Sequence, residues 1–226
     1  RKSSRNDRQR NKRQRKVKTI VFKANFSDED KNEVLTLQKE YSFAFRRMFS
    51  NMELMQDPDF LASLPIKSKK QIEYLQKEVL AFYERFESAR EKVLSSIKSL
   101  EAIAKPNLKQ FRRLHRLNKS LSKSIVFGDK SELVRLSKGI GDKESWVASR
   151  LLPLVFYGET ANFGNRFFSF KEISVGKLLF KLSKETHIPI SFNPKKHQKE
   201  IDALQELALR KEISVTVKLS AEKLFI

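Results

Sequence analysis

Basic residues recur at helical spacing between Pro106 and Lys123, and side chains of this type bind phosphate groups. The segment PNLKQFRRLHRLNKSLSK places cations three or four residues apart, with Arg113 beside them: Lys109, Arg112, Arg116, Lys119 and Lys123. Positions with this spacing share one face of a helix. Because like charges on one face repel each other unless an anion lies alongside, we expect this face to contact nucleic-acid backbone. A plain solvated surface is the alternative.

The stretch YGETANFGNRFFSF, residues 157–170, combines glycines with clustered phenylalanines. Gly158 and Gly164 are two of only six glycines in the chain. Glycine tolerates positive φ or lets another backbone approach closely, so it marks a turn or a contact. After Gly164 the period changes to two, with Phe168 and Phe170 facing one way. We therefore predict a loop that leads into a β-strand.

Metal and thiol chemistry have little support in the sequence. The chain has no cysteine, which excludes disulfides, thiolate zinc sites and cysteine nucleophiles and is typical of a reducing compartment. His115, His187 and His197 are scattered without a spacing that brings imidazoles together on a helix. We expect no metal site, cofactor or small-molecule substrate in this segment.

The charge balance indicates a polyanionic partner. The chain has 47 Lys and Arg against 27 Asp and Glu, a formal net charge of +20 over 226 residues, which is more than solubility requires. Residues 1–16 hold nine of the cations and no large apolar residue, so we predict a disordered basic tail. This tail is either a solvated terminus or localisation signal, or an arm that grips phosphates.

A membrane partner is not expected. No apolar run approaches the roughly 18 residues of a membrane span, and no signal peptide is visible. We expect a soluble intracellular protein, cytoplasmic and nucleoid-associated in a bacterium or nuclear in a eukaryote.

The spacing of apolar residues changes along the chain from a strand pattern to a helical one. Residues 16–26 alternate as a strand. Ser27, followed by three acidic residues, predicts a helix N-terminus, and the helix runs to about Ser50. A second helix spans roughly Lys69–Ala104 and is about 50 Å long. The basic segment forms a third helix.

The β pattern returns from Ser124. SIVFG ends in Gly128, and a helical patch carries Trp146 and Arg150. Trp146 is expected to pack in the core, with base stacking as the alternative. Further elements are predicted as strands at 176–183, 188–192, 213–219 and 222–226 and a helix at 196–211. The fold class is therefore α+β, a β-barrel interrupted by a helical domain.

Several short motifs follow one another in a defined order. They are a strand VKTIVFKANF, a helix with Tyr-x-Phe-Ala-Phe, VFG, Trp-x-x-x-Arg, Gly-x-x-x-x-x-Gly-Asn-Arg, and two β-hairpins around a helix. This order and spacing resemble the N-terminal half of TnpB proteins and of their relatives, the type V CRISPR effectors. The resemblance covers most of residues 17–226.

The resemblance implies an OB-like wedge barrel interrupted by a helical recognition lobe. Residues 17–26 are expected to be the first barrel strand, residues 27–123 the lobe, and residues 124–226 the remainder of the barrel. In this family the lobe contacts a short target-adjacent DNA motif and the RNA–DNA heteroduplex, and the wedge domain holds the structured part of the guide RNA.

The resemblance also implies particular site residues. Those assigned to the wedge domain are Phe127, Gly128, Trp146, Arg150, Gly164, Asn165 and Arg166. We expect Gly158 and Gly164 to bring the loop backbone close to RNA and Asn165 and Arg166 to hydrogen-bond to it. An ordinary turn with Arg166 as a surface cation is the alternative. Arg46 and Arg47 stand where the family often has Asn, so they are expected to contact nucleic acid without a specific DNA-reading role.

The implied function is guide-RNA and target-DNA binding within a transposon-associated, RNA-guided DNA endonuclease. In the family a RuvC-like nuclease domain follows, and LSAEKLFI ends before the first catalytic Asp is expected. We therefore expect no catalytic carboxylates in this segment, and Mg²⁺ only in the nuclease domain. A nuclease-less nucleic-acid-binding protein or RNA-guided repressor is one alternative, and a basic protein bound to ribosomal RNA or membrane is another.

Overall fold

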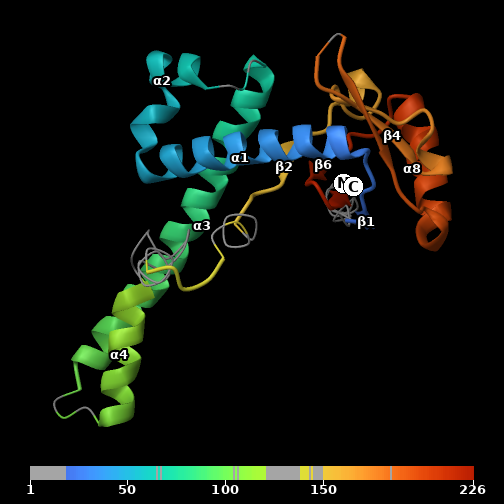
Figure 1. Ribbon diagram of the computed structural model, residues 1–226. Helices are drawn as coiled ribbons and strands as arrows, with labels where there is room; N and C mark the ends of the chain where they lie inside the picture. Colours follow the sequence, from blue (N-terminus) through green and yellow to red (C-terminus); the bar gives the residue numbers. More distant parts are fainter. Residues whose placement is uncertain are drawn as a thin grey trace, which may run out of the picture.

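The computed structural model describes most of the chain and gives it an α+β fold. The described residues are 19–64, 66, 68–103, 105, 107–120, 138–142, 144, 150–183 and 185–226. Within them, a long helical segment follows the first strand, and the other strands come after it (Figure 1). The predicted basic tail and the predicted strand SIVFG lie outside the described residues.

Among the described residues, four α-helices lie between the first strand and the others. They are α1 (Asp28–Ser50), α2 (Pro58–Ser63), α3 (Lys69–Glu101) and α4 (Leu108–Ser120). The predicted cap is confirmed, because the Ser27 hydroxyl accepts a hydrogen bond of 3.1 Å from the Asp30 N–H. Figure 1 shows α3 and α4 together as an arm that projects away from the rest of the molecule.

The helices α1 and α3 are held together by aromatic side chains. Phe49 of α1 makes edge-to-face contacts with Phe82 and Phe86 of α3, with ring centroids 5.4 and 5.5 Å apart. The connection between the two helices contains prolines, which are typical of a loop. It contains α2 and a 3-10 helix, η1 (Met52–Met55), because Asp57 caps a short helix that has Pro58 in its first turn.

Seven short strands in the described residues form two antiparallel sheets. One has the order β1-β7-β6-β2 and the other β3-β4-β5. Their bounds are β1 Val21–Lys23, β2 Leu154–Phe156, β3 Phe168–Ser169, β4 Lys177–Lys181, β5 His187–Ser191, β6 Val217–Leu219 and β7 Lys223–Phe225. Helix α8 (Gln198–Leu209) lies between β5 and β6 in the chain. Neither sheet closes into a barrel within these residues.

Phenylalanines fill the space between the two sheets. Phe156 of β2 is 2% exposed, and its ring lies 5.2, 5.3 and 5.1 Å from those of Phe167, Phe168 and Phe180. Buried Gln38 ties α1 to the β part, since its amide donates to the Leu152 carbonyl and accepts from the Ala221 N–H. One continuous core therefore supports both helices and strands.

Candidate nucleic-acid interface

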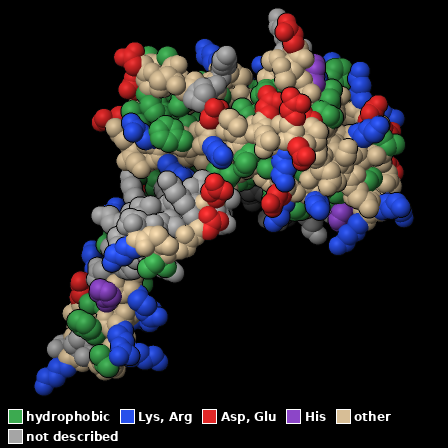
Figure 2. Space-filling model, viewed as in Figure 1, with side chains coloured by type: hydrophobic (Ala, Val, Ile, Leu, Met, Phe, Trp, Pro, Cys, Tyr) green, Lys and Arg blue, Asp and Glu red, His purple; other side chains and the backbone are tan. Residues whose placement is uncertain are grey.

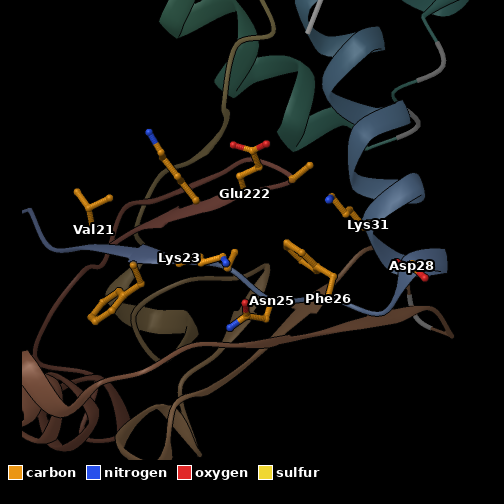
Figure 3. Close-up of a pocket in the computed structure, with 11 residues that line it drawn as sticks. Val21, Lys23, Asn25, Phe26, Asp28, Lys31 and Glu222 are labelled. Atoms are coloured by element: carbon orange, nitrogen blue, oxygen red, sulfur yellow. The ribbon is translucent and has the colours of Figure 1, made fainter. Parts of the chain in front are cut away.

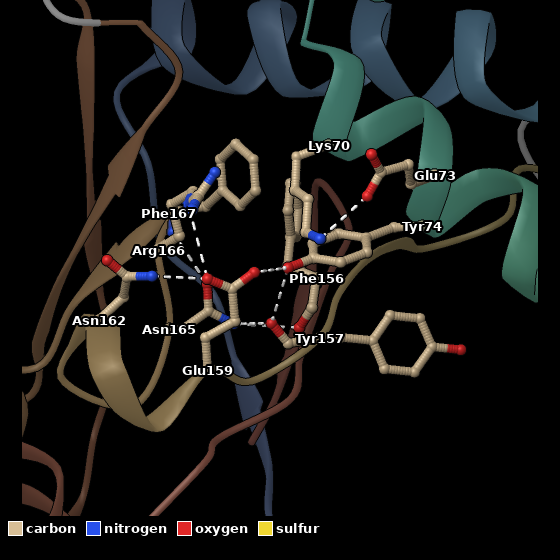
Figure 4. Close-up of polar contacts among 10 residues, drawn as sticks. All are labelled: Lys70, Glu73, Tyr74, Phe156, Tyr157, Glu159, Asn162, Asn165, Arg166 and Phe167. Atoms are coloured by element: carbon tan, nitrogen blue, oxygen red, sulfur yellow. Dashed lines mark hydrogen bonds and ion pairs between the residues drawn. The ribbon is translucent and has the colours of Figure 1, made fainter. Parts of the chain in front are cut away.

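Asn165 lies inside the molecule, at the end of residues 157–167, which we call the glycine loop (Figure 4). It is 1% exposed. Its Nδ2 group donates to the carbonyls of Val215 and Phe156, at 2.9 and 3.1 Å, and its Oδ1 atom accepts from the Phe167 N–H at 2.9 Å. Both ends of the amide are thus used within the protein. This geometry gives Asn165 a structural role in place of the expected RNA contact.

Gly158 and Gly164 bring the glycine loop against the protein's own chain. The Gly164 carbonyl accepts a 2.8 Å hydrogen bond from the Val215 N–H. Gly164 has φ +92°, and a Cβ atom there would lie 3.2 Å from side-chain atoms of Ala208 and Val215. A Cβ atom on Gly158 would overlap the Val215 backbone nitrogen. The close approach inferred from these glycines is present, but its partner is the segment before β6 and not RNA.

Arg166 differs from its neighbour because it reaches the surface. Its side chain is 53% exposed, and its Nε atom lies 3.5 Å from Oε2 of Glu159. Glu159 also accepts hydrogen bonds from the Tyr74 hydroxyl at 2.6 Å and from the Asn162 amide at 2.5 Å. The bond from Tyr74 is the main cause that lowers the pKa of the Glu159 carboxyl. Arg166 remains available to an anion, with its charge partly balanced by Glu159.

Two tyrosine–glutamate pairs connect α3 to the strand part, and Figure 4 shows the first of them, Tyr74 with Glu159. Tyr74 of α3 donates to Glu159 of the glycine loop, and Tyr157 of that loop donates to Glu78 of α3. The two rings meet edge to face at 5.3 Å, and Lys77 lies over the Tyr157 ring at 4.0 Å. Burial raises the pKa of both hydroxyls. The glycine loop is therefore fixed to α3 at one end of the helical arm.

Arg46 and Arg150 meet where α1 approaches β2. The Arg46 Nη2 group donates a 2.7 Å hydrogen bond to the Arg150 carbonyl. Burial lowers the pKa of both guanidinium groups, and for Arg150 the nearby charge of Arg46 adds to this. Arg47 is exposed, with its guanidinium 6.0 Å from the centre of the exposed Phe43 ring. Arg46 thus joins two elements, and Arg47 points to solvent.

Helix α4 carries the largest group of predicted contacts. Lys109, Arg112, Arg113 and Arg116 are all exposed on it. No Asp or Glu occurs between residues 107 and 123. Figure 2 shows Lys and Arg side chains gathered at the free end of the arm, with hydrophobic side chains between them. The sequence-predicted basic face is present on this helix.

The apolar residues of α4 recur every three positions but do not form a single buried stripe. Leu114 and Leu117 are half-buried, and α4 packs against α3. Leu108 and Phe111 are 64% and 60% exposed. A series of three-residue steps drifts around a helix with 3.6 residues per turn, so the first and last members face different ways.

Other predicted residues lie outside the described part of the chain. These are Lys123, Phe127, Gly128 and Trp146, and for Lys119 the structure describes the backbone but not the side chain. Their expected roles stay predictions.

An open groove beside β1 was missed by the sequence analysis (Figure 3). It has a volume of about 730 Å³, and Lys23, Lys31 and Glu222 line it from three different segments. Lys23 and Lys223 are direct cross-strand partners on the exposed side of the sheet. Like charges opposite each other are unfavourable, which a bound anion would relieve, but Asp28 and Glu222 also line the groove. In each of these two strands an exposed Lys stands next to a buried apolar residue, Lys23 after Phe22 and Lys223 before Leu224. This pattern was the sequence signal that could have indicated the groove.

The described residues contain no group of three or more His, Asp or Glu side chains placed to hold a metal ion. None of the described helices is long and apolar enough to cross a membrane.

Comparisons with protein-family models, with curated proteins and with solved structures find no match to this chain.

Proposed function

We propose that this chain is the guide-RNA- and target-DNA-binding portion of an RNA-guided DNA endonuclease of the TnpB and type V CRISPR class. The observation that carries the proposal is the exposed surface of α4, where four cations lie on a projecting arm without an acidic neighbour on the helix. An exposed surface of this kind attracts a polyanion, and RNA-guided proteins hold their nucleic acids through the backbone.

The arrangement of the strands supports a wedge-like barrel as part of this proposal. Backbone hydrogen bonds of 2.8 and 3.0 Å between Asn25 and Ser191 connect the edge of one sheet to the edge of the other. At the opposite edges, Phe156 of β2 packs on Phe168 of β3. The two sheets thus curve around one core, and the helices α1 to α4 are inserted between β1 and β2, as the resemblance implies.

Sequencing the RNA that copurifies with the protein tests the proposal. The expected result is enrichment of one RNA species with a constant structured part and a guide segment, because the wedge domain would select the structured part. Bulk ribosomal RNA, or no RNA above the level of an unrelated basic protein, would refute guide binding. Washing at increasing salt before extraction removes RNA that is held by charge alone.

A further inference from the structure

Two large apolar side chains share the solvent-facing side of α4 with its cations. We call this side the outer face; it consists of Leu108, Lys109, Phe111, Arg112, His115 and Arg116. Single exposed hydrophobic residues are common on protein surfaces. Here, however, these side chains line one open groove of about 750 Å³ together with the cations. An aromatic ring and the charges beside it can therefore act on the same ligand.

The small apolar area of the outer face favours nucleic acid over a membrane as the ligand. A helix that lies in a membrane surface presents a broad apolar side, often with Trp, Phe and Leu. Among the described side chains of α4, Leu108 and Phe111 are the large exposed apolar ones, whereas Leu114 and Leu117 are half-buried. A single ring flanked by cations matches a base with its neighbouring phosphates.

The spacing of Phe111, Arg112 and Arg116 on α4 matches single-stranded nucleic acid. Arg112 follows Phe111 directly, and Arg116 lies four residues further on, about 6 Å along the helix axis. These two guanidinium groups can reach successive phosphates while the Phe111 ring faces a base between them. The bases of a duplex are stacked on each other, so only an unpaired base can offer its face to Phe111.

We propose that the outer face of α4 binds an unpaired stretch of nucleic acid, with a base stacked on Phe111 and the phosphates on Arg112 and Arg116. The inference rests on the proposed function and adds that the bound nucleic acid is single-stranded. Its binding to α4 is expected to depend little on the base sequence. Stacking is sequence-tolerant because every base has a π-face.

The test uses the full chain and a single-stranded RNA oligonucleotide that carries 2-aminopurine at one position. Stacking on Phe111 is expected to change the 2-aminopurine fluorescence on binding. Phe111→Ala is expected to lose this change and to weaken single-strand affinity by on the order of tenfold. Phe111→Trp is expected to keep the fluorescence change and the single-strand affinity. The affinity for a duplex of equal length is expected to be the same in all variants. Leu80→Ala on α3, which also removes an exposed apolar side chain, is the matched control.

The outcomes separate this inference from the proposed function. If Phe111→Ala binds single strands like the wild type, or if abasic and ordinary oligonucleotides bind equally, the stacking site is refuted. Binding to nucleic acid can persist in that case, because Lys109, Arg112 and Arg116 supply the charge. If the wild type binds neither single strands nor duplexes, the proposed function fails as well. Loss of binding to anionic lipid vesicles in Phe111→Ala, with oligonucleotide binding unchanged, would instead assign the outer face to a membrane.

Discussion

Asn165 and Arg166 are neighbours in the sequence, but the Asn165 side chain is buried and the Arg166 side chain reaches solvent. The Asn165 side chain is enclosed by carbonyl and N–H groups of three segments, and the Arg166 side chain is half exposed. A sequence motif of Gly, Asn and Arg fits both a turn and an RNA contact. The structure divides the motif, with Gly164 and Asn165 building the loop and Arg166 facing solvent.

Substitution of each residue separates these roles. Asn165→Ala is expected to lower the free energy of unfolding by about 1–3 kcal/mol, because the buried carbonyls of Phe156 and Val215 lose a donor. Arg166→Ala is expected to change it by less than about 1 kcal/mol, since its ion pair with Glu159 is largely exposed. Urea unfolding of both variants measures this. RNA affinity that falls in folded Asn165→Ala, with stability unchanged, would contradict the structural role.

At the level of elements, the sequence predicted most helices and hairpins but fewer of their contacts. The helices α1, α3 and α8 follow from long apolar periods and a serine cap, and the strands β4 and β5 follow from short apolar runs rich in Leu, Ile and Phe. Strand β2 was missed because all three of its residues are buried, which removes the alternation. The partners of Asn165 and Tyr74 could not be predicted, since they lie far away in the sequence.

The contact between α3 and the glycine loop predicts a pH dependence of stability. The pKa of Glu159 is lowered in the folded protein, chiefly by the Tyr74 hydroxyl, so the unfolded chain takes up this proton more readily. The contribution is present above the ordinary carboxyl pKa of about 4.3 and is lost as the pH falls through the lowered value. Tyr74→Phe removes the hydroxyl. We expect its deficit in unfolding free energy, relative to wild type, to be large at pH 7 and smaller at pH 3.

Urea unfolding of wild type and Tyr74→Phe across this pH range measures the effect. The other carboxyl groups titrate in both proteins, so they cancel in the difference between the two curves. Arg90→Gln, which breaks an exposed pair with Glu87 on α3, serves as the control and is expected to show little change. A constant deficit for Tyr74→Phe at all pH values would show that the hydroxyl does not act through the Glu159 charge.

At the scale of the whole molecule, the charge is spread unevenly over the helical arm. Along α3 the cations alternate with acidic residues, including the pairs Lys70–Glu73 and Arg90–Glu87. Along α4 no acidic residue accompanies them. Within the arm, α3 therefore has mixed charge and α4 is basic, so that a polyanion is attracted to α4 more strongly than to α3 (Figure 2).

The most direct measurement is the salt dependence of nucleic-acid affinity in two matched variants. One replaces Lys109, Arg112 and Arg116 of α4 with Gln. The other replaces the exposed Arg85, Arg90 and Lys92 of α3 with Gln and removes the same net charge. The account predicts that the slope of log affinity against log salt becomes shallower by about 0.7 to 0.9 per lost phosphate contact in the α4 variant, and by little in the α3 variant. Equal slopes in both variants and the wild type would show that α4 does not hold phosphates and would contradict the proposed interface.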